Sequence, residues 1–227
     1  MAKCLFVAGT ATDVGKTFIS AQIVKCLRDN NFNAGYYKAA ASGVELDDKG
    51  HLTGGDPIYV NDTANIGEQT ENLVSYVYKE AVSPHLAAKI NNNPIDFDII
   101  THDFTRAKNK YDYLVVEGSG GVVCPLRFDD TKKIMLLDIV TAFNLPIVLV
   151  ADAGLGTINA AVLTVEYLQR RNIKIKGIIL NYFRDELMER DNLMMIETLT
   201  NIPVIAKVQR GDNSLNMDIN NLIKIFE

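Results

Sequence analysis

A glycine-rich loop near the N-terminus carries the residue types that bind a nucleotide phosphate. Residues 9–17 read Gly-Thr-Ala-Thr-Asp-Val-Gly-Lys-Thr, which matches the pattern G-x-x-x-x-G-K-[ST]. The glycines let backbone N–H groups face a phosphate, and the helix that follows adds its positive dipole. Lys16 would reach the β- and γ-phosphates, and the Thr17 hydroxyl would bind Mg²⁺. Because the loop lies between an apolar run and a helical segment, we favour nucleotide binding over an ordinary strand-to-helix turn.

A carboxylate at the end of another apolar run is a candidate Mg²⁺ ligand. Glu117 follows the run Tyr113–Val116 and precedes four small residues, Gly118, Ser119, Gly120 and Gly121. Mg²⁺ at phosphate sites usually takes one or two carboxylates in addition to the phosphates. Small residues let a ligand approach the backbone closely, although a flexible turn would have the same composition. We therefore expect Glu117 and this turn to lie beside the glycine-rich loop.

The elements that must position these residues follow from the hydrophobic pattern, in which short apolar runs alternate with longer segments of helical period. The runs are Cys4–Ala8, Ala34–Tyr37, Tyr113–Val116, Pro146–Ala151, Ile175–Leu180 and Pro203–Ala206. The helical segments are Lys16–Asn30, Ser83–Asn91, Asp96–Lys108, Ile134–Phe143, Thr157–Arg171 and Asp185–Leu199. Strands that are apolar throughout are covered on both faces. The pattern therefore predicts an α/β fold with a mostly parallel central sheet and helices on both faces. Ligands in such folds bind at the carboxyl ends of the strands.

Length and composition limit the class of protein. The chain has 227 residues, is 48% hydrophobic and contains no repeat or linker, so we expect a single domain over residues 1–227. A net charge of −5 without a long basic run argues against nucleic-acid binding. No apolar stretch approaches the ~20 residues that span a bilayer and no signal sequence is visible, so we expect no membrane contact and a cytoplasmic location. The spacing of the cysteines and histidines suggests no disulfide, zinc site or catalytic histidine.

Several motifs together resemble the dethiobiotin synthetase family. That family shows G-T-x-T-[DE]-V-G-K-T, K-P-x-x-S-G and V-E-G-A-G-G segments, and their counterparts here are residues 9–17, 38–43 and 116–121. Further matches are Gly55-Asp56, Ser83-Pro84-His85, the turn 154–159 and Asn181 at the end of a later run. They occur in the family's order and span most of the chain. The resemblance implies a single-domain P-loop NTPase fold and an ATP-dependent ligase.

The resemblance also implies a reaction. One amine of 7,8-diaminopelargonic acid would capture CO₂ as a carbamate, which ATP would then phosphorylate with the help of Mg²⁺. The second amine would attack the mixed anhydride, giving dethiobiotin, ADP and phosphate, a step of biotin biosynthesis. Such chemistry needs cations around the carbamate and the γ-phosphate and the exclusion of water. The family binds the substrate tail across a dimer interface, so the resemblance implies a homodimer.

Residue roles are carried over by matched positions. The residues placed at the nucleotide and its metal ion are Thr12, Asp13, Val14, Gly15, Lys16, Thr17, Asp56, Glu117, Gly118, Ser119, Gly120 and Asn181. The residues placed at the substrate are Lys38, Ser42, Gly120, Gly121, Thr157, Ile158 and Asn159. Of these, Lys38, Lys16 and Thr12 would act on the carbamate and the transferred phosphoryl group. Thr17, Asp56 and Glu117 would hold Mg²⁺, and Asn181 would pair with the adenine edge.

Some positions depart from the family. Ala39 stands where proline is usual, and we expect a looser loop there. The stretch Ala206–Gln209 lacks a usual proline, which leaves the preference for the nucleotide base open. Cys124 follows the glycine turn without an activating partner, so we favour a buried structural thiol.

Three other functions remain as alternatives. A regulatory or partitioning ATPase would carry an extra lysine early in the loop, where Thr10, Ala11 and Thr12 stand here. A ligase acting on a larger dicarboxylate would usually carry a glutaminase domain, for which the chain has no room. An inactive nucleotide-binding module would not need the set Lys16, Thr17, Lys38, Asp56 and Glu117.

Overall fold

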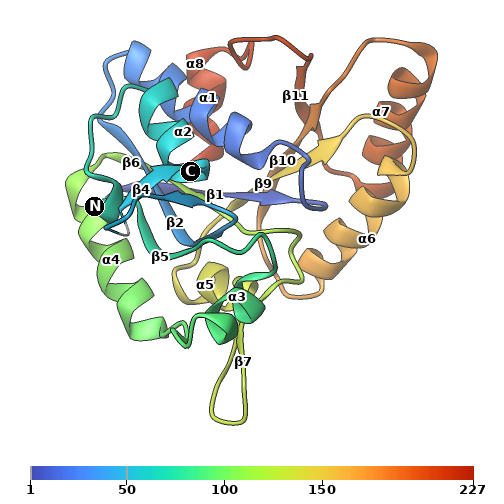
Figure 1. Ribbon diagram of the computed structural model, residues 1–227. Helices are drawn as coiled ribbons and strands as arrows, with labels where there is room; N and C mark the ends of the chain where they lie inside the picture. The colour runs from blue at the N-terminus through green and yellow to red at the C-terminus, as the bar shows by residue number, and fades with distance from the viewer. Residues whose placement is uncertain (1, 50) are drawn as a thin grey trace.

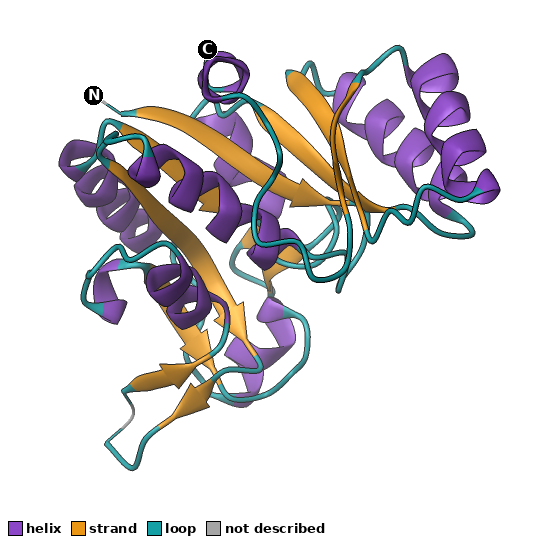
Figure 2. Ribbon diagram, turned by 90° about the horizontal axis from the view of Figure 1, so that it is seen from above, coloured by secondary structure: helices purple, strands orange, loops and turns teal. Residues whose placement is uncertain are grey.

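The computed structural model describes residues 2–49 and 51–227, and its centre is a parallel sheet. Seven strands from these residues pair in the order β11-β10-β9-β1-β6-β2-β5, and Figures 1 and 2 show the sheet from two sides. These strands are β1 (Lys3–Gly9), β2 (Ala34–Ser42), β5 (Val74–Tyr78), β6 (Tyr113–Glu117), β9 (Ile147–Asp152), β10 (Ile175–Asn181) and β11 (Val204–Val208). All neighbouring pairs are parallel, so the carboxyl ends of the strands meet at one edge.

Helices cover both faces of the sheet. They are α1 (Lys16–Asp29), α2 (Asp56–Thr63), α3 (Pro84–Ile90), α4 (Phe97–Lys110), α5 (Leu136–Ala142), α6 (Thr157–Gln169), α7 (Leu187–Thr200) and α8 (Ile219–Ile225), with a short 3₁₀ helix η1 (Thr70–Asn72). Figure 1 shows α1, α2 and α8 on one side of the sheet and α3, α4 and α5 on the other. The central strand β1 is buried on both faces, because Leu5 and Val7 pack toward the first side and Phe6 and Ala8 toward the second.

The predicted class of fold is confirmed, and several boundaries differ. Strand β2 continues from Ala34 to Ser42, so Lys38 and Ser42 lie within the strand and not after it. Ala39 is buried in this strand, and the expectation of a looser loop there was wrong. β2 pairs with β6 over Ala34–Lys38 and with β5 over Lys38–Ser42, and the pairing with β5 keeps it extended beyond its apolar run.

The predicted helix over residues 134–143 was wrong at its start. Lys133–Met135 form strand β8, which pairs antiparallel with β7 (Pro125–Phe128), and helix α5 begins at Leu136. A second small hairpin joins β3 (Glu45–Leu46) and β4 (Leu52–Gly54). Strand β5 and helix α8 were not predicted. Within the described ranges, none of the helices combines the length and the apolar character needed to cross a membrane.

Candidate active site

The glycine-rich loop joins β1 to α1 at the carboxyl edge of the sheet. Gly15 precedes the helix with φ of 94°, a left-handed conformation that favours glycine. A Cβ atom on this residue would lie 2.0 Å from Nδ2 of Asn181, so the position also has no room for a side chain. That Nδ2 atom donates to the Val14 carbonyl over 3.0 Å and thereby fixes the loop to the end of β10. Lys16 folds back onto the same loop, with Nζ 3.1 Å from the Ala11 carbonyl.

A compact group of charged and polar side chains lies next to this loop. Nζ of Lys38 donates to Oε1 of Glu117 over 2.6 Å and also to Oδ2 of Asp56. Oγ1 of Thr17 lies 2.9 Å from Oδ1 of Asp56 and 2.9 Å from Oε1 of Glu117. Lys38 and Glu117 are almost wholly buried, with 3% and 2% of their surface exposed. The structure therefore brings all three predicted metal ligands to the predicted catalytic lysine.

The register of the sheet explains this convergence. In the parallel pair β2–β6, Lys38 stands opposite Glu117 and Tyr36 stands opposite Val115. Side chains on one strand alternate between faces, so Tyr36 and Lys38 share a face, which is the face covered by α1. Tyr36 uses this position to donate its hydroxyl to Oε2 of Glu117 over 3.0 Å. Asp56 reaches the group from the first turn of α2, where its charge is favourable to the helix dipole.

The electrostatics of the group favour the charged forms of Lys38 and Asp56. Burial opposes the charge of Lys38, but the carboxylates of Glu117 and Asp56 outweigh it and raise the pKa of the ammonium group. Burial likewise disfavours the charge of Asp56, and the neighbouring Lys38 outweighs it and lowers the pKa of that carboxyl. Burial and the charge of Lys38 lower the pKa of Lys16. Burial and then the charge of Glu117 raise the pKa of Tyr36, so its hydroxyl remains a donor.

A cavity of about 370 Å³ opens above this group. Its lining includes these predicted site residues: Thr12, Asp13, Gly15, Lys16, Thr17, Lys38, Ser42, Asp56, Glu117, Ser119 and Gly120. Val14 and Gly118 support the lining without being part of it: Val14 is buried, and Gly118 packs against the ring of Phe6. Asn181 is not part of this lining: its side chain donates a hydrogen bond to the Val14 carbonyl of the loop, and the residue is 2% exposed. Its predicted contact with adenine stays a prediction.

The predicted residues of the substrate tail lie elsewhere. Thr157, Ile158 and Asn159 form the first turn of α6, with Thr157 buried and Asn159 exposed. Gly121 lines a second cavity of about 490 Å³ that also touches Thr10 of the loop and Leu163 on α6. This groove connects the region of the glycine-rich loop with the outer surface of α6. In the part of the chain that the structure describes, the Thr157 hydroxyl is buried without a hydrogen-bond partner.

The oxygen atoms of the group fit the needs of Mg²⁺. This ion prefers hard oxygen ligands and is usually bound by one or two carboxylates together with substrate phosphates. Asp56 and Glu117 each place a carboxylate oxygen 2.9 Å from the Thr17 hydroxyl, beside a loop of the phosphate-binding type. Lys38 forms ion pairs with the same two carboxylates and thereby neutralises part of their negative charge.

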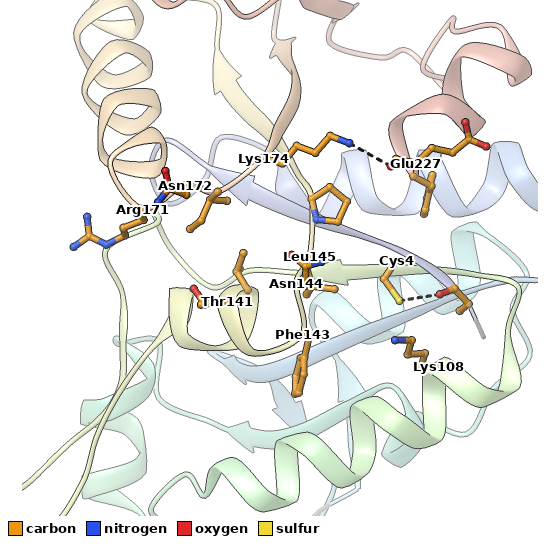
Figure 3. A pocket seen from close by; sticks show the side chains of 15 residues that line it. Cys4, Lys108, Thr141, Phe143, Asn144, Leu145, Arg171, Asn172, Lys174 and Glu227 are labelled. Carbon is orange, nitrogen blue, oxygen red and sulfur yellow. Dashed lines mark hydrogen bonds between the residues drawn. The ribbon is translucent and has the colours of Figure 1, made fainter.

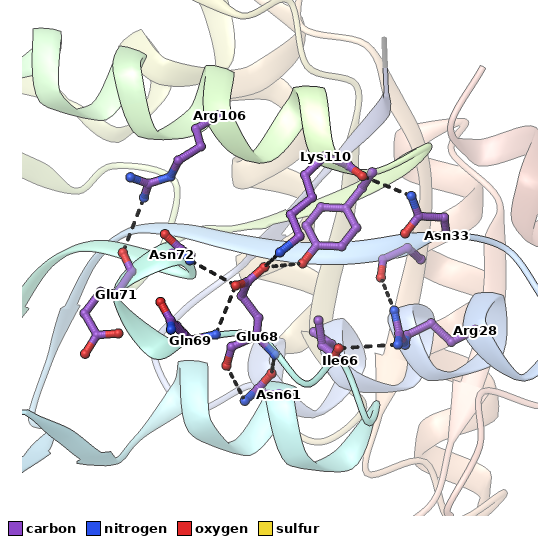
Figure 4. Close-up of polar contacts among 12 residues, drawn as sticks. Arg28, Asn33, Asn61, Ile66, Glu68, Gln69, Glu71, Asn72, Arg106 and Lys110 are labelled. Carbon is purple, nitrogen blue, oxygen red and sulfur yellow. Dashed lines mark hydrogen bonds and ion pairs between the residues drawn. The ribbon is translucent and has the colours of Figure 1, made fainter.

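Helix α2, which carries Asp56, is fixed at its other end by a polar network (Figure 4). Asn61 exchanges two hydrogen bonds of 3.1 Å with the backbone of Glu68. The Glu68 carboxylate accepts from Asn72 over 2.9 Å, from the Tyr111 hydroxyl over 3.0 Å and from Lys110. Burial disfavours the charge of Glu68, but these donors outweigh it and lower the pKa of the carboxyl to about 2. The network ties α2 to the end of α4.

A larger cavity, of about 520 Å³, lies apart from this chemistry (Figure 3). Two of its cations, Arg171 and Lys174, contact other groups of the protein. Nζ of Lys174 donates to the Glu227 carbonyl over 3.3 Å, and the guanidinium of Arg171 stacks 3.6 Å from the centre of the Tyr167 ring. Its thiol, Cys4, is buried, and burial raises its pKa to about 11. The cavity does not include the glycine-rich loop or Lys38, so we assign no part of the reaction to it.

Sequence reasoning missed two residues of the site. Tyr36 was not recognised, although its position two residues before Lys38 in a strand places it on the same face. Tyr182 lines the cavity and has φ of 60°, which is unusual for an aromatic residue. The guanidinium of Arg210 lies 4.9 Å from the centre of its ring. Cys124 is buried as expected, and burial raises the pKa of its thiol to about 11.

Comparison with known proteins gives close relatives over the whole chain. Residues 3–217 match the model of a family described as an AAA domain. The chain is 46% identical over 228 residues to a Brachyspira hyodysenteriae protein named ATP-dependent dethiobiotin synthetase BioD, with 100% of each covered. It is 47% identical to a Clostridium botulinum protein of the same name, with 100% of this chain and 99% of that protein covered.

Solved structures with a similar fold are more distant in sequence. A ParA family ATPase from Chlorobium tepidum matches with a TM-score of 0.56 and 14% identity, covering 99% of this chain and 89% of that one. The MinD cell division protein of Aquifex aeolicus matches with a TM-score of 0.55 and 14% identity, covering 99% and 86%. At this identity the likeness shows the fold alone, which is that of the P-loop NTPases.

Proposed function

The chain belongs to the dethiobiotin synthetase family, and we propose that it uses ATP to close the ring of 7,8-diaminopelargonic acid with CO₂. The products would be dethiobiotin, ADP and phosphate, as in biotin biosynthesis. The observation that carries the proposal is the buried group at the carboxyl edge of the sheet. There Lys38 lies against Glu117 and Asp56, within the same cavity wall as Lys16 of the glycine-rich loop.

The proposed reaction has three steps, none of which needs a covalent bond to the protein. An amine of the substrate attacks CO₂ and loses a proton, which gives a carbamate. A carbamate oxygen then attacks the γ-phosphorus of ATP, and ADP leaves with the electron pair of the broken P–O bond. The second amine attacks the carbonyl carbon of the mixed anhydride and loses a proton, phosphate leaves with the electron pair of the broken C–O bond, and the ring is closed.

This chain's own residues would bind and orient the anions of these steps. Lys16 would leave the Ala11 carbonyl and reach the β- and γ-phosphates, while loop N–H groups hold the remaining oxygens. Lys38 would present its ammonium to the carbamate and to the charge that develops on the transferred group. Ser42 and Gly120 line the same cavity and would position the reacting amines, with Thr12 beside the γ-phosphate.

We propose Mg²⁺ as the metal of this site, held by Thr17, Asp56 and Glu117. When bound, it would neutralise the phosphate oxygens and orient the triphosphate. The oxygen ligands and their position beside the loop support this assignment.

We also propose a homodimer in which the α6 helix of one chain receives the tail of a substrate bound to the other. A terminal carboxylate suits the free N–H groups at the start of a helix. The groove lined by Gly121, Thr10 and Leu163 supports this proposal, because Gly121 is the chain neighbour of Gly120 in the reaction cavity and Leu163 lies on α6.

The family assignment does not favour a regulatory ATPase. The relatives that are 46–47% identical are named dethiobiotin synthetases, whereas the ParA and MinD proteins share only 14% of residues with this chain. The early loop positions Thr10, Ala11 and Thr12 also lack the additional lysine expected of such a switch.

The test is phosphate release with MgATP, bicarbonate and 7,8-diaminopelargonic acid. We expect release only when all three are present, together with a product of the mass of dethiobiotin. Hydrolysis of ATP at the same rate without the diamine would instead favour a switch ATPase.

A further inference from the structure

Tyr36 contacts the candidate metal site from the interior of the protein. Its side chain is fully buried on β2, and its hydroxyl donates to Oε2 of Glu117 over 3.0 Å. The other oxygen of this carboxylate, Oε1, lies 2.9 Å from Oγ1 of Thr17 and 2.6 Å from Nζ of Lys38. The two oxygens of Glu117 therefore have different partners: Oε2 binds a hydroxyl of the core, and Oε1 binds side chains of the site.

A buried carboxylate can hold such an orientation only if both oxygens have partners. An oxygen left without a donor in the core is costly, so the group would turn toward whatever donors remain. Those donors, Thr17 and Lys38, lie on the Oε1 side and are themselves part of the site. The hydrogen bond from the Tyr36 hydroxyl to Oε2 would oppose this rotation.

We propose that Tyr36 is a positioning residue for the Mg²⁺ site, acting through Glu117. This inference rests on the proposed function, in which Glu117 is a metal ligand. Groups that hydrogen-bond to a ligating carboxylate fix its orientation, and their loss typically weakens metal binding ~10–100-fold. Phenylalanine would fill nearly the same volume as Tyr36, so only the hydroxyl bond would be lost.

The neighbouring residue provides a matched control. Tyr37 is also fully buried on β2, but it belongs to the core on the opposite face of the sheet. Its hydroxyl lies 2.7 Å from Oγ of Ser75 and 3.2 Å from the Ile100 carbonyl, both remote from the glycine-rich loop in the fold. Tyr37→Phe therefore removes a buried hydroxyl from the same strand without touching Glu117.

The experiment measures ATP binding by calorimetry over a series of Mg²⁺ concentrations, together with the thermal midpoint of each protein. For Tyr36→Phe we expect the Mg²⁺ concentration that gives half-maximal tightening of ATP binding to rise by about tenfold. We expect Tyr37→Phe to lower the thermal midpoint about as much as Tyr36→Phe does, because each variant loses one buried hydroxyl. Tyr37→Phe should leave the Mg²⁺ dependence of ATP binding as in the wild type. In a Glu117→Gln background, the further change Tyr36→Phe should have little effect on the Mg²⁺ dependence, because the route through the carboxylate is already lost.

The outcomes separate this inference from the proposed function. Equal Mg²⁺ dependence in Tyr36→Phe and Tyr37→Phe would show that Tyr36 only stabilises the core, and would overturn the inference. An undiminished effect of Tyr36→Phe in the Glu117→Gln background would overturn the route through Glu117. If wild-type ATP binding did not depend on Mg²⁺, the inference would fail together with the metal assignment. Mg²⁺-dependent ATP binding without diamine-dependent phosphate release would contradict only the proposed reaction.

Discussion

Lys38 and Glu117 form an ion pair that is almost completely removed from solvent. Asp56 adds a second carboxylate to the same ammonium group. Breaking a buried pair by removing one partner is strongly destabilising, because the remaining charge has neither water nor a counter-ion. The side chain that we propose to act on the carbamate therefore also stabilises the fold of its own site.

We predict that Lys38→Met lowers the free energy of unfolding by about 3–5 kcal/mol and abolishes diamine-dependent phosphate release. Mg²⁺ alone should stabilise this variant more than it stabilises the wild type, since two carboxylates then lack a cation. Urea denaturation with and without Mg²⁺ measures both effects. Lys132→Met is the control, because its ion pair of 3.1 Å with Asp96 is exposed and should contribute about 1 kcal/mol or less. Equal losses in the two variants would show that Lys38 is not the counter-ion of the site.

The sequence predicts those site residues that lie in motifs with fixed spacing. Lys16, Thr17 and Glu117 follow from the loop pattern and from the end of an apolar run, and the structure places them together. Tyr36 could not be found in this way, because its role depends on which strand lies beside β2 and in which register. Its alternation with Lys38 gives the face, but only the pairing with β6 gives the partner, Glu117.

Among the strands of the sheet, six were predicted from their apolar runs, including the edge strand β11, and the other edge strand, β5, was not. Strands such as β9, with an apolar run buried on both faces, have a clear signal. Strand β5 lies at the edge of the sheet, and burial alternates along it, so Ser75 and Val77 are partly exposed. The β7–β8 hairpin was hidden because Ile134 belongs to an apolar stretch that continues into α5.

The network around Glu68 links helix α2 to the end of helix α4 (Figure 4). Because Asp56 lies in the first turn of α2, we expect this link to contribute to the position of Asp56. Its carboxyl has a pKa of about 2 against an ordinary value of 4.5. A carboxyl with a lowered pKa in the folded state adds stability above its unfolded pKa. This stability is lost as the pH falls through the folded pKa. The contribution of Glu68 should therefore be complete above about pH 4.5 and disappear toward pH 2.

We predict that Glu68→Gln lowers the free energy of unfolding at pH 7 by about 1–3 kcal/mol, since one pKa unit corresponds to about 1.4 kcal/mol and Lys110 is exposed. The difference from the wild type should shrink as the pH is lowered from about 4.5 toward 2. Urea denaturation at several pH values measures this difference. Glu71→Gln, an exposed change on the neighbouring η1, should have little effect at any pH. A difference between wild type and Glu68→Gln that stays constant with pH would contradict a role for the carboxylate charge.

At the scale of the whole molecule, the groove beside α6 is bordered by exposed apolar side chains. Of the residues that line it, Leu163 is exposed by 58% and Val123 by 59%, and Leu155, in the turn before α6, is exposed by 94%. Leu163 is four residues after Asn159, so both lie on one face of the helix. An apolar face beside a predicted carboxylate site suits the contact of a second chain, which would cover the substrate tail.

We predict that Leu163→Lys disrupts the proposed homodimer, because a charge in an apolar contact is costly to desolvate. The KM for the diamine should rise at least about tenfold, since a loss of about 1.4 kcal/mol in tail binding is enough. ATP affinity should remain as in the wild type, because the glycine-rich loop belongs to one chain. Light scattering gives the association state, steady-state kinetics the KM, and calorimetry the ATP affinity. Ile99→Lys, on the exposed face of α4, is the control and should remain dimeric with an unchanged KM. A wild-type protein that is monomeric and fully active, or a Leu163→Lys variant with unchanged KM, would contradict a site shared between two chains.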